Sequence, residues 1–501
     1  MKNSIVADYV LSHDPLTISP EFVGFLANLE SVSHVSPEIA SSIVQELADQ
    51  RSYLKLIASE NYSSLPSQQA MSNLLTDKYA EGYPDHRFYA GCDNVDDIEA
   101  FAVSKACEIF GSDHAYVQPH SGADANMVAY WAILHERVKS PALEKLGEKN
   151  PLKLSNRDWE AVRTELNNQR LLGLDYYSGG HLTHGYRHNV SAQLFDAYSY
   201  GVDLDTGLLD YDDIEKKALE IKPLILLAGY SAYPRLINFK RMREIADKCG
   251  AVFMVDMAHF AGLVAGKVFT GDHDPVAHAH VVTTTTHKTL RGPRGGMVLC
   301  TSEFKDAVDK GCPLVLGGPL PHVMAAKAVA FVEASYPSFA DYARKIVENS
   351  RALAAACVEK GMTIATGGTD NHLMLIDVRP FDLTGRQAES VLRECGITLN
   401  RNSLPADPNG AWYTSGLRIG TPAVTTLGMG IDEMKEIADV MYDVLSKTAA
   451  ASDDLGRISK ARYTIPQETV IRARSRIQEL LDMFKLYPEL DLDFLSTVFL
   501  K

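Results

Sequence analysis

Lys288 is the residue whose type and position point most directly to chemistry. It follows the run 281–287, which is β-branched and hydroxyl-rich and predicts a buried strand. Most lysines at strand ends reach solvent, because lysine is rarely fully buried unless it is paired or used. A buried lysine loses its proton more readily and can act as an amine nucleophile. Lys288 is therefore a candidate for a Schiff-base lysine, with a carbonyl substrate or with pyridoxal phosphate.

Two other segments offer groups that pyridoxal phosphate chemistry needs. Asp256 ends the apolar stretch 252–255, and a carboxylate there would keep the pyridine nitrogen protonated, although an aspartate in this position could also cap a helix. Ser121 and Gly122 lie between a predicted strand and a predicted helix. Their hydroxyl and backbone amides can bind a phosphate or cap the helix, since both use the same geometry.

Three further residues complete this candidate set. His181, in the segment 179–185, could lie over a cofactor ring or bind a metal with His184, but H-x-x-H is a weak metal signal and we predict no metal site. Arg418 could clamp a substrate carboxylate, or form an ordinary surface ion pair. Glu81 lies in an aromatic loop segment and is a candidate acid or base if burial raises its pKa.

The elements that must position these residues alternate between strand and helix. Nearly continuous apolar strands in such an order predict an α/β fold with a mostly parallel sheet covered on both faces. Ligands of such sheets gather at the carboxyl ends of the strands, where Asp256, Lys288 and the segment after Gln118 fall. We expect strands at 114–118, 223–228, 251–256, 281–286 and 296–300, and helices at 122–137 and 240–248.

The whole chain is expected to divide into three parts. Residues 1–50 are expected to form an N-terminal helical arm, 51–339 a large domain that includes a helix at 322–333, and 340–501 a smaller α+β domain with helices at 342–360 and 386–394 and a strand at 373–378. The charged segment at about 138–170 is expected to be a solvated insertion in the large domain.

Composition excludes several classes of protein. A net charge of −15 argues against general nucleic-acid binding, and no apolar stretch is long enough to cross a membrane. Seven scattered cysteines without a C-x-x-C pair, and an N-terminus that lacks a signal peptide pattern, predict a cytoplasmic protein with reduced thiols.

Eight motifs in order along the chain resemble the serine hydroxymethyltransferase (glycine hydroxymethyltransferase) family of fold-type I pyridoxal phosphate enzymes. They span roughly residues 50–430, and the longer ones are highly specific. The motifs are L-I-A-S-E-N-Y (56–62), Y-A-E-G-Y-P (79–84), Q-P-H-S-G-A (118–123), G-G-H-L-T-H-G (179–185), D-M-A-H-F-A-G-L (256–263), V-V-T-T-T-T-H-K-T-L (281–290), G-G-T-D-N-H (367–372) and S-G-L-R-I-G-T-P-A (415–423).

The resemblance implies a reaction and a cofactor. L-serine and tetrahydrofolate would give glycine and 5,10-methylenetetrahydrofolate, with pyridoxal 5'-phosphate held as an aldimine on Lys288 and tetrahydrofolate as co-substrate. It also implies a homodimer with the active site shared between subunits, and a tetramer is possible.

The resemblance further implies a role for each site residue. Around the cofactor it implies Asp256 on the ring nitrogen, His181 on the ring face, Ser231 and His259 on the phenolic side, and Ser121 and Gly122 on the phosphate, with Gly318 of a neighbouring subunit. For the substrates it implies Arg418 and Ser59 on the amino acid carboxylate, Tyr79, Glu81 and Tyr89 from the partner subunit with Glu81 handling protons, and Tyr176, Gly180, Glu81 and Asn402 at the folate.

Some residues depart from the family pattern, chiefly at the folate edge. Tyr176 stands where a small apolar contact is usual, Phe88 where a tyrosine is usual, and Leu316 where a glutamine is usual. We therefore predict intact cofactor chemistry. The competing interpretations are a related enzyme that cleaves threonine or serine or racemises alanine without folate, and a non-catalytic protein that binds the cofactor or partners through the insertion.

Overall fold

The computed structural model describes residues 4–14, 16–452 and 456–500. Its centre is a seven-stranded sheet in the order β4-β10-β9-β8-β7-β5-β6. Strands β6, β5, β7, β8 and β9 run parallel, while β10 is antiparallel to both β9 and β4. The predicted α/β fold with a mostly parallel central sheet is confirmed. The strands are β4 (His114–Tyr116), β5 (Arg170–Leu174), β6 (Asp196–Tyr200), β7 (Ile225–Gly229), β8 (Val252–Asp256), β9 (Val281–Thr285) and β10 (Gly296–Cys300).

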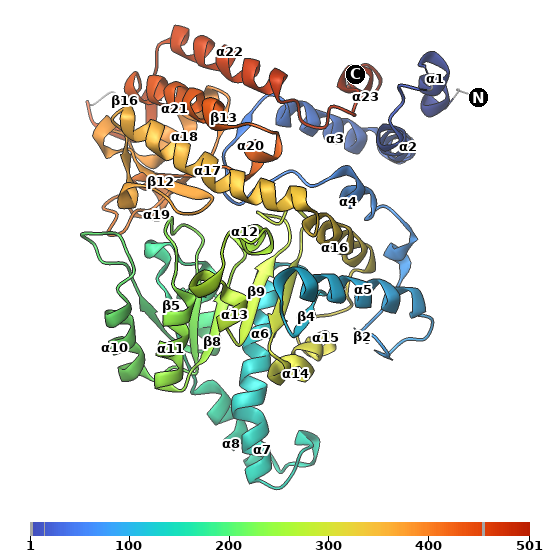
Figure 1. Ribbon diagram of the computed structural model, residues 1–501, viewed down its shortest axis with the longest axis vertical. Coiled ribbons are helices and arrows are strands. Elements are labelled where there is room, and N and C mark those ends of the chain that lie inside the picture. Colours follow the sequence, from blue (N-terminus) through green and yellow to red (C-terminus); the bar gives the residue numbers. More distant parts are fainter. Residues whose placement is uncertain (1–3, 15, 453–455, 501) are drawn as a thin grey trace.

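Alternate residues of each central strand enter two different hydrophobic cores. In β8, Phe253 and Val255 pack into one core while Val252 and Met254 pack into the other. This arrangement explains why the strands are apolar throughout rather than alternating. Helix α6 (Gly122–Leu134) covers one face; α5 (Asp93–Phe110), α11 (Phe239–Cys249), α12 (Ala261–Ala265) and α16 (Pro321–Ala334) pack on the other (Figure 1).

A second, antiparallel sheet has the order β11-β12-β15-β14 and its own hydrophobic core. The long helix α17 (Pro337–Glu359) contributes Ile346 to the first core and Leu353 to this one, so it joins the two bodies. The remaining elements of this part are β11 (Thr363–Ile364), β12 (Leu373–Asp377), α18 (Gly385–Glu394), β13 (Ile397–Thr398), β14 (Asn400–Asn402), β15 (Gly416–Gly420), α20 (Pro422–Thr426), α21 (Ile431–Ser446), β16 (Ala449–Ser452), β17 (Ile458–Thr464) and α22 (Gln467–Met483). Strand β1 (Leu54–Lys55) pairs with β13.

The described residues between 4 and 50 form helices, and these helices pack against the C-terminal part of the chain (Figure 1). Helices α1 (Ile5–Ser12), α2 (Pro20–Val35) and α3 (Pro37–Gln50) share a small core with α23 (Leu492–Phe499). Arg51 holds this contact by donating hydrogen bonds to the carbonyls of Leu486, Tyr487 and Leu490.

The charged segment after α6 projects from the body of the molecule (Figure 1). The helix predicted for 122–137 is α-helical only to Leu134 and continues through a π-helical turn, His135–Lys139, into α7 (Ser140–Lys145). Together with α8 (Asn156–Asn167) it encloses a small core of Ala142, Leu143 and Val162. No helix in the described ranges is long and apolar enough to cross a membrane.

Candidate active site

Lys288 lies just beyond the carboxyl end of β9, as the sequence pattern predicts. Its ammonium nitrogen donates a hydrogen bond of 3.0 Å to Thr285 Oγ1. Burial lowers the pKa of Lys288 to about 8, although the Asp256 carboxylate acts in the opposite direction. At this pKa about a tenth of the side chain is a neutral amine at pH 7. Lys288 therefore has the burial and the acidity of an amine nucleophile.

Asp256 ends β8 and is buried, and its carboxylate accepts three hydrogen bonds. His184 Nε2 and Asn126 Nδ2 approach the same oxygen, Oδ2, at 3.2 and 2.9 Å, and the amide of Ala258 donates to Oδ1 at 3.0 Å. His184 Nδ1 accepts the His181 amide, so its Nε2 is the nitrogen that donates. Burial alone would raise the pKa of Asp256, but the His184 hydrogen bond and the adjacent histidines hold it well below its ordinary value. The carboxylate stays ionised at neutral pH.

His181, His184 and Asp256 are the three residues within the described ranges whose ligand atoms lie close enough together, within 4.8 Å, to hold a metal ion. Two of these residues already bond each other, since His184 Nε2 lies 3.2 Å from Asp256 Oδ2, and His181 Nδ1 lies 2.8 Å from Thr183 Oγ1. Burial lowers the pKa of His181 to about 4, which keeps the ring neutral. The cluster therefore acts as a hydrogen-bonded network that orients a carboxylate and a neutral imidazole.

The N-terminus of α6 lies beside Thr285 and Asp256. Ser121 caps the helix by accepting the amide of Asp124, and Gly122 is its first residue. A Cβ on Gly122 would lie 2.7 Å from Thr285 Cγ2, and Thr285 is the residue that Lys288 contacts. Asn126, one turn further along α6, bonds Asp256. An anion-binding helix terminus thus lies beside the lysine and the aspartate.

Arg418, on β15, brings the second sheet into this site. Its guanidinium donates to Asn400 Oδ1 at 3.1 Å and to the carbonyl and hydroxyl of Ser231 at 2.7 and 3.1 Å. No carboxylate of the described residues pairs with it, and burial lowers its pKa to about 10, so it stays charged at neutral pH. A buried guanidinium without an anionic partner is suited to bind one from outside the chain.

His259 lies between Ser231 and a second buried histidine, His372. Its Nε2 lies 3.5 Å from Ser231 Oγ, and its Nδ1 lies 3.2 Å from His372 Nε2. Both histidine rings are buried and stack with centroids 5.5 Å apart. Burial and the neighbouring Lys288 and Arg418 charges lower the pKa of both imidazoles, so the pair is neutral at pH 7.

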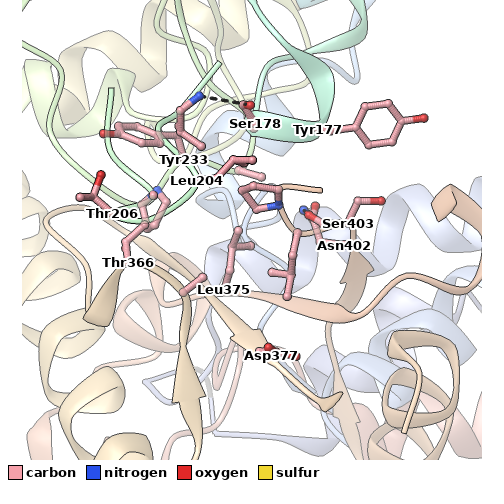
Figure 2. Close-up of a pocket in the computed structure, with 18 of the residues that line it drawn as sticks. Tyr177, Ser178, Leu204, Thr206, Tyr233, Thr366, Leu375, Asp377, Asn402 and Ser403 are labelled. Atoms are coloured by element: carbon pink, nitrogen blue, oxygen red, sulfur yellow. Dashed lines mark hydrogen bonds between the residues drawn. The ribbon is translucent and has the colours of Figure 1, made fainter. Parts of the chain in front are cut away.

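A cavity of about 240 Å³ opens above these groups. Arg418, Ser231 and His181 line it together with Tyr176, Gly180 and Asn402, three of the four residues expected at the folate; the fourth, Glu81, does not line it. Ser59 is not among the residues that line this cavity, but its neighbour Ala58 packs against β15, the strand of Arg418: the Ala58 Cα lies 2.4 Å from where a Gly420 Cβ would be. A second cavity of about 380 Å³ shares Asn402 and Ser403 with the first (Figure 2). Figure 2 shows Leu375 and Asp377 of the small sheet facing Ser178, Leu204 and Tyr233 across it.

Four of the expected site residues lie elsewhere and form a group of their own. The Tyr79 and Tyr89 rings lie 4.9 Å apart, and Gly318 lies against Tyr79 and Glu81. Both tyrosines are about half exposed, at 56% and 46%. Within the ranges described, no hydrogen bond or ring contact joins this group to Lys288, Asp256 or Arg418. Two nearby residues depart from the family pattern: Phe88 is exposed, and Leu316 is buried in the core against α6.

Several residues that build the site were not singled out from the sequence. They are Asn126, Thr285, His372 and Asn400, and His184 was considered only as a metal ligand. Two signals were present: Asn126 lies one helical turn after Gly122, on the face of α6 that meets the strand ends, and His372 ends one of the motifs. Asn400 had no signal, because only the pairing of β14 with β15 places it opposite Arg418.

Comparison with known proteins agrees with this geometry. A family model described as "Serine hydroxymethyltransferase" matches residues 32–147 and 159–441. A serine hydroxymethyltransferase of Treponema pallidum is 63% identical over 499 residues, which cover 100% of this chain and 87% of the relative. That of Salinispora tropica is 57% identical, covering 94% and 99%, and that of Chlamydia trachomatis serovar D is 51% identical, covering 94% and 95%. Its lysine, aspartate and arginine lie near enough for the last two to shift the pKa of the lysine, and the chain belongs to the serine hydroxymethyltransferase family.

Proposed function

We propose that the pocket around Lys288 interconverts L-serine plus tetrahydrofolate and glycine plus 5,10-methylenetetrahydrofolate with the help of pyridoxal phosphate. The observation that carries this proposal is the convergence of a half-buried lysine of lowered pKa, a buried ionised aspartate and a guanidinium that has no carboxylate partner, with the aspartate and the guanidinium both near enough to shift the pKa of the lysine. Each group serves one part of the chemistry, and the family fixes the substrates.

The residues present fit pyridoxal phosphate. The α6 N-terminus, with Ser121 and Gly122, offers amides and a hydroxyl to its phosphate, and Gly122 has no Cβ to block the approach. Lys288 would bind its aldehyde carbon, Asp256 would hold a proton on its ring nitrogen, and His181, Ser231 and His259 would contact its ring. When bound, the cofactor supplies an electron sink for the bonds at the substrate α-carbon.

The substrate groups are assigned to the remaining residues. Arg418, with Ser59, would hold the amino acid carboxylate and so fix which α-carbon bond faces the cofactor. Glu81 would move protons at the serine hydroxyl and the folate, with Tyr79 and Tyr89 beside it. Tyr176, Gly180 and Asn402 would contact the folate, and their place in the cavity beside Arg418 supports this.

Replacing Arg418 with lysine is expected to raise the KM for serine about a hundredfold while turnover at saturation changes less. A lysine keeps the charge but not the planar pair of donors, and the Asn400 and Ser231 contacts that aim the guanidinium would be lost. Steady-state kinetics over a wide range of serine concentration would measure this. Arg379→Lys, on a guanidinium that already pairs with Asp377, is the matched control; an unchanged KM in Arg418→Lys would contradict the assignment.

We also propose that the protein works as a homodimer in which Tyr79, Glu81, Tyr89 and Gly318 complete the site of the neighbouring subunit. Within one chain these residues form an exposed group apart from Lys288, although the reaction needs them beside it. A second copy of the chain would supply them. A tetramer built from two such dimers is compatible with this proposal.

Two inactive variants are therefore expected to restore activity when mixed. Glu81→Gln and Lys288→Ala each damage a different half of a shared site, so a mixed dimer carries one intact site. Random exchange of subunits would restore about a quarter of the wild-type sites. The measurement is activity after the two variants are unfolded and refolded together. No recovery, with exchange verified by mass-tagged subunits, would show that each chain uses its own Glu81.

We further propose the division into an arm of residues 1–50, a large domain of 51–339 and a small domain of 340–501, with α17 shared by the two cores. A cytoplasmic location is proposed as well, because the seven cysteines are free.

The test of the function is serine cleavage by the purified protein with and without tetrahydrofolate. We expect visible absorbance from the lysine-bound cofactor, and glycine formation that depends on folate. Cleavage without folate dependence would favour an aldolase or racemase, with Tyr176 as the altered contact. A protein that does not take up pyridoxal phosphate would overturn the whole proposal.

A further inference from the structure

Lys327, on α16, is a buried cation that the proposed reaction does not use. Its side chain is 1% exposed. Its ammonium nitrogen donates to three backbone carbonyls, those of Val117 at 2.6 Å, Pro119 at 2.9 Å and Gly296 at 2.8 Å. No carboxylate is in contact with it in the part of the chain that is described. Burying an unpaired charge is costly, so its retention calls for a reason.

The three contacts indicate the charged form of the side chain. An ammonium group has three donors and no acceptor, which matches three carbonyl oxygens, whereas a neutral amine would turn its lone pair toward one of them. Burial lowers the pKa of Lys327 to about 7, and the carboxylates of Glu99 and Asp124 act against this from a distance. Glu99 is itself paired with Arg87, so its charge is largely compensated.

Two of the three carbonyls that accept from Lys327 belong to the turn that leads into α6, and the third belongs to β10. Val117 and Pro119 follow β4, and Gly296 begins β10 and donates its amide to Pro119. A Cβ on Gly296 would lie 2.1 Å from the Ser121 carbonyl, and one on Gly295 would lie 2.5 Å from Lys327 Cε. Lys327 thus lies directly behind the residues that precede Ser121 and Gly122.

We infer that Lys327 is a positioning residue for the cofactor phosphate: its ammonium fixes the 117–121 turn and adds a positive charge behind the phosphate-binding end of α6. The inference rests on the proposed phosphate site at Ser121 and Gly122. If Lys327 had only the mechanical role of connecting β4 to β10, its loss would weaken the binding of pyridoxal phosphate and of pyridoxal equally, or of neither. Charge reinforces anion binding through the low-dielectric interior, where no solvent screens it.

The test compares two ligands that differ only in the phosphate group, pyridoxal 5'-phosphate and pyridoxal. Dissociation constants for both are measured on the apo forms of the wild type, Lys327→Met and Lys327→Gln. Methionine fills the space without a charge, and glutamine also keeps donors for two of the carbonyls. Lys267→Met is the matched control, because Lys267 also donates to a backbone carbonyl, that of Ile109, at 2.7 Å. Far-ultraviolet circular dichroism checks that each variant is folded.

We expect both Lys327 variants to bind pyridoxal phosphate about tenfold more weakly and to bind pyridoxal nearly as well as the wild type. Inorganic phosphate should also raise the Tm of the apo wild type more than that of Lys327→Gln. If both ligands weaken equally, or neither does, the inference is overturned. If Lys327→Met does not fold, Lys327→Gln, which keeps more of the hydrogen bonds, carries the comparison. A wild type that prefers pyridoxal phosphate no more than pyridoxal would instead refute the phosphate site itself.

Discussion

Replacing Lys288 with alanine is expected to lower serine turnover about a thousandfold or more. Lys288 is the residue that we propose binds the cofactor covalently. Burial lowers the pKa of its amine, and a hydrogen bond to Thr285 orients it. Its loss removes both the covalent link and the amine that takes part in proton transfer. The residues that hold the phosphate and ring remain, so the variant should still bind pyridoxal phosphate, but without a covalent link.

The two effects can be measured separately. Incubation with pyridoxal phosphate, reduction with borohydride and intact-mass analysis should show one cofactor added to each wild-type chain at Lys288, with that linkage absent from Lys288→Ala. Lys240→Ala is a suitable control, because Lys240 is half exposed and pairs with the half-exposed Asp272. Normal turnover, or unchanged labelling at the same peptide, in Lys288→Ala would exclude the catalytic assignment.

Five of the seven strands of the central sheet could be predicted from the sequence because each is a short apolar run bounded by turn residues. Strands β5 and β6 were missed: β5 directly follows the charged segment, and β6 is polar and largely exposed. The predicted 296–300 strand matches β10 in full, and 281–286 differs from β9 by one residue. The antiparallel direction of β10 did not follow from apolar content, which is the same for either direction. The length of the connection determines this direction. Residues 286–295 are too few for a helical crossover, so β10 must run antiparallel to β9.

The chemical groups of the site could be predicted, but their supports could not. Lys288, Asp256 and Arg418 are unusual in their own segments, so local reasoning finds them. Asn126 and His372 are ordinary residues until the fold brings α6 and the second sheet to the strand ends. The packing of α1–α3 against α23 is equally long-range, since it joins the two ends of the chain.

Replacing Asp256 with asparagine is expected to lower turnover by a factor of about a hundred to a thousand with little change in fold. The side chain keeps its shape, but its amide cannot hold a proton on the cofactor's ring nitrogen, so the cofactor withdraws electrons less strongly. The substitution also removes the negative charge to which His184 and Asn126 both donate through Oδ2. The donors around Asp256 would then face a group with half the acceptor capacity.

Single-turnover measurements with saturating serine and folate would separate this effect from weakened cofactor binding. Asp256→Glu keeps the charge but lengthens the side chain in a buried site, so it should retain more activity than Asp256→Asn only if charge outweighs fit. Asp272→Asn, on a half-exposed carboxylate, should behave as the wild type. Because hydrogen bonds hold the pKa of Asp256 well below its ordinary value, its charge is present throughout the range from mildly acidic to alkaline pH. The defect of Asp256→Asn should therefore be nearly constant across that range, and a defect that vanished at mildly acidic pH would mean that the carboxylate titrates there and is not held as the structure has it.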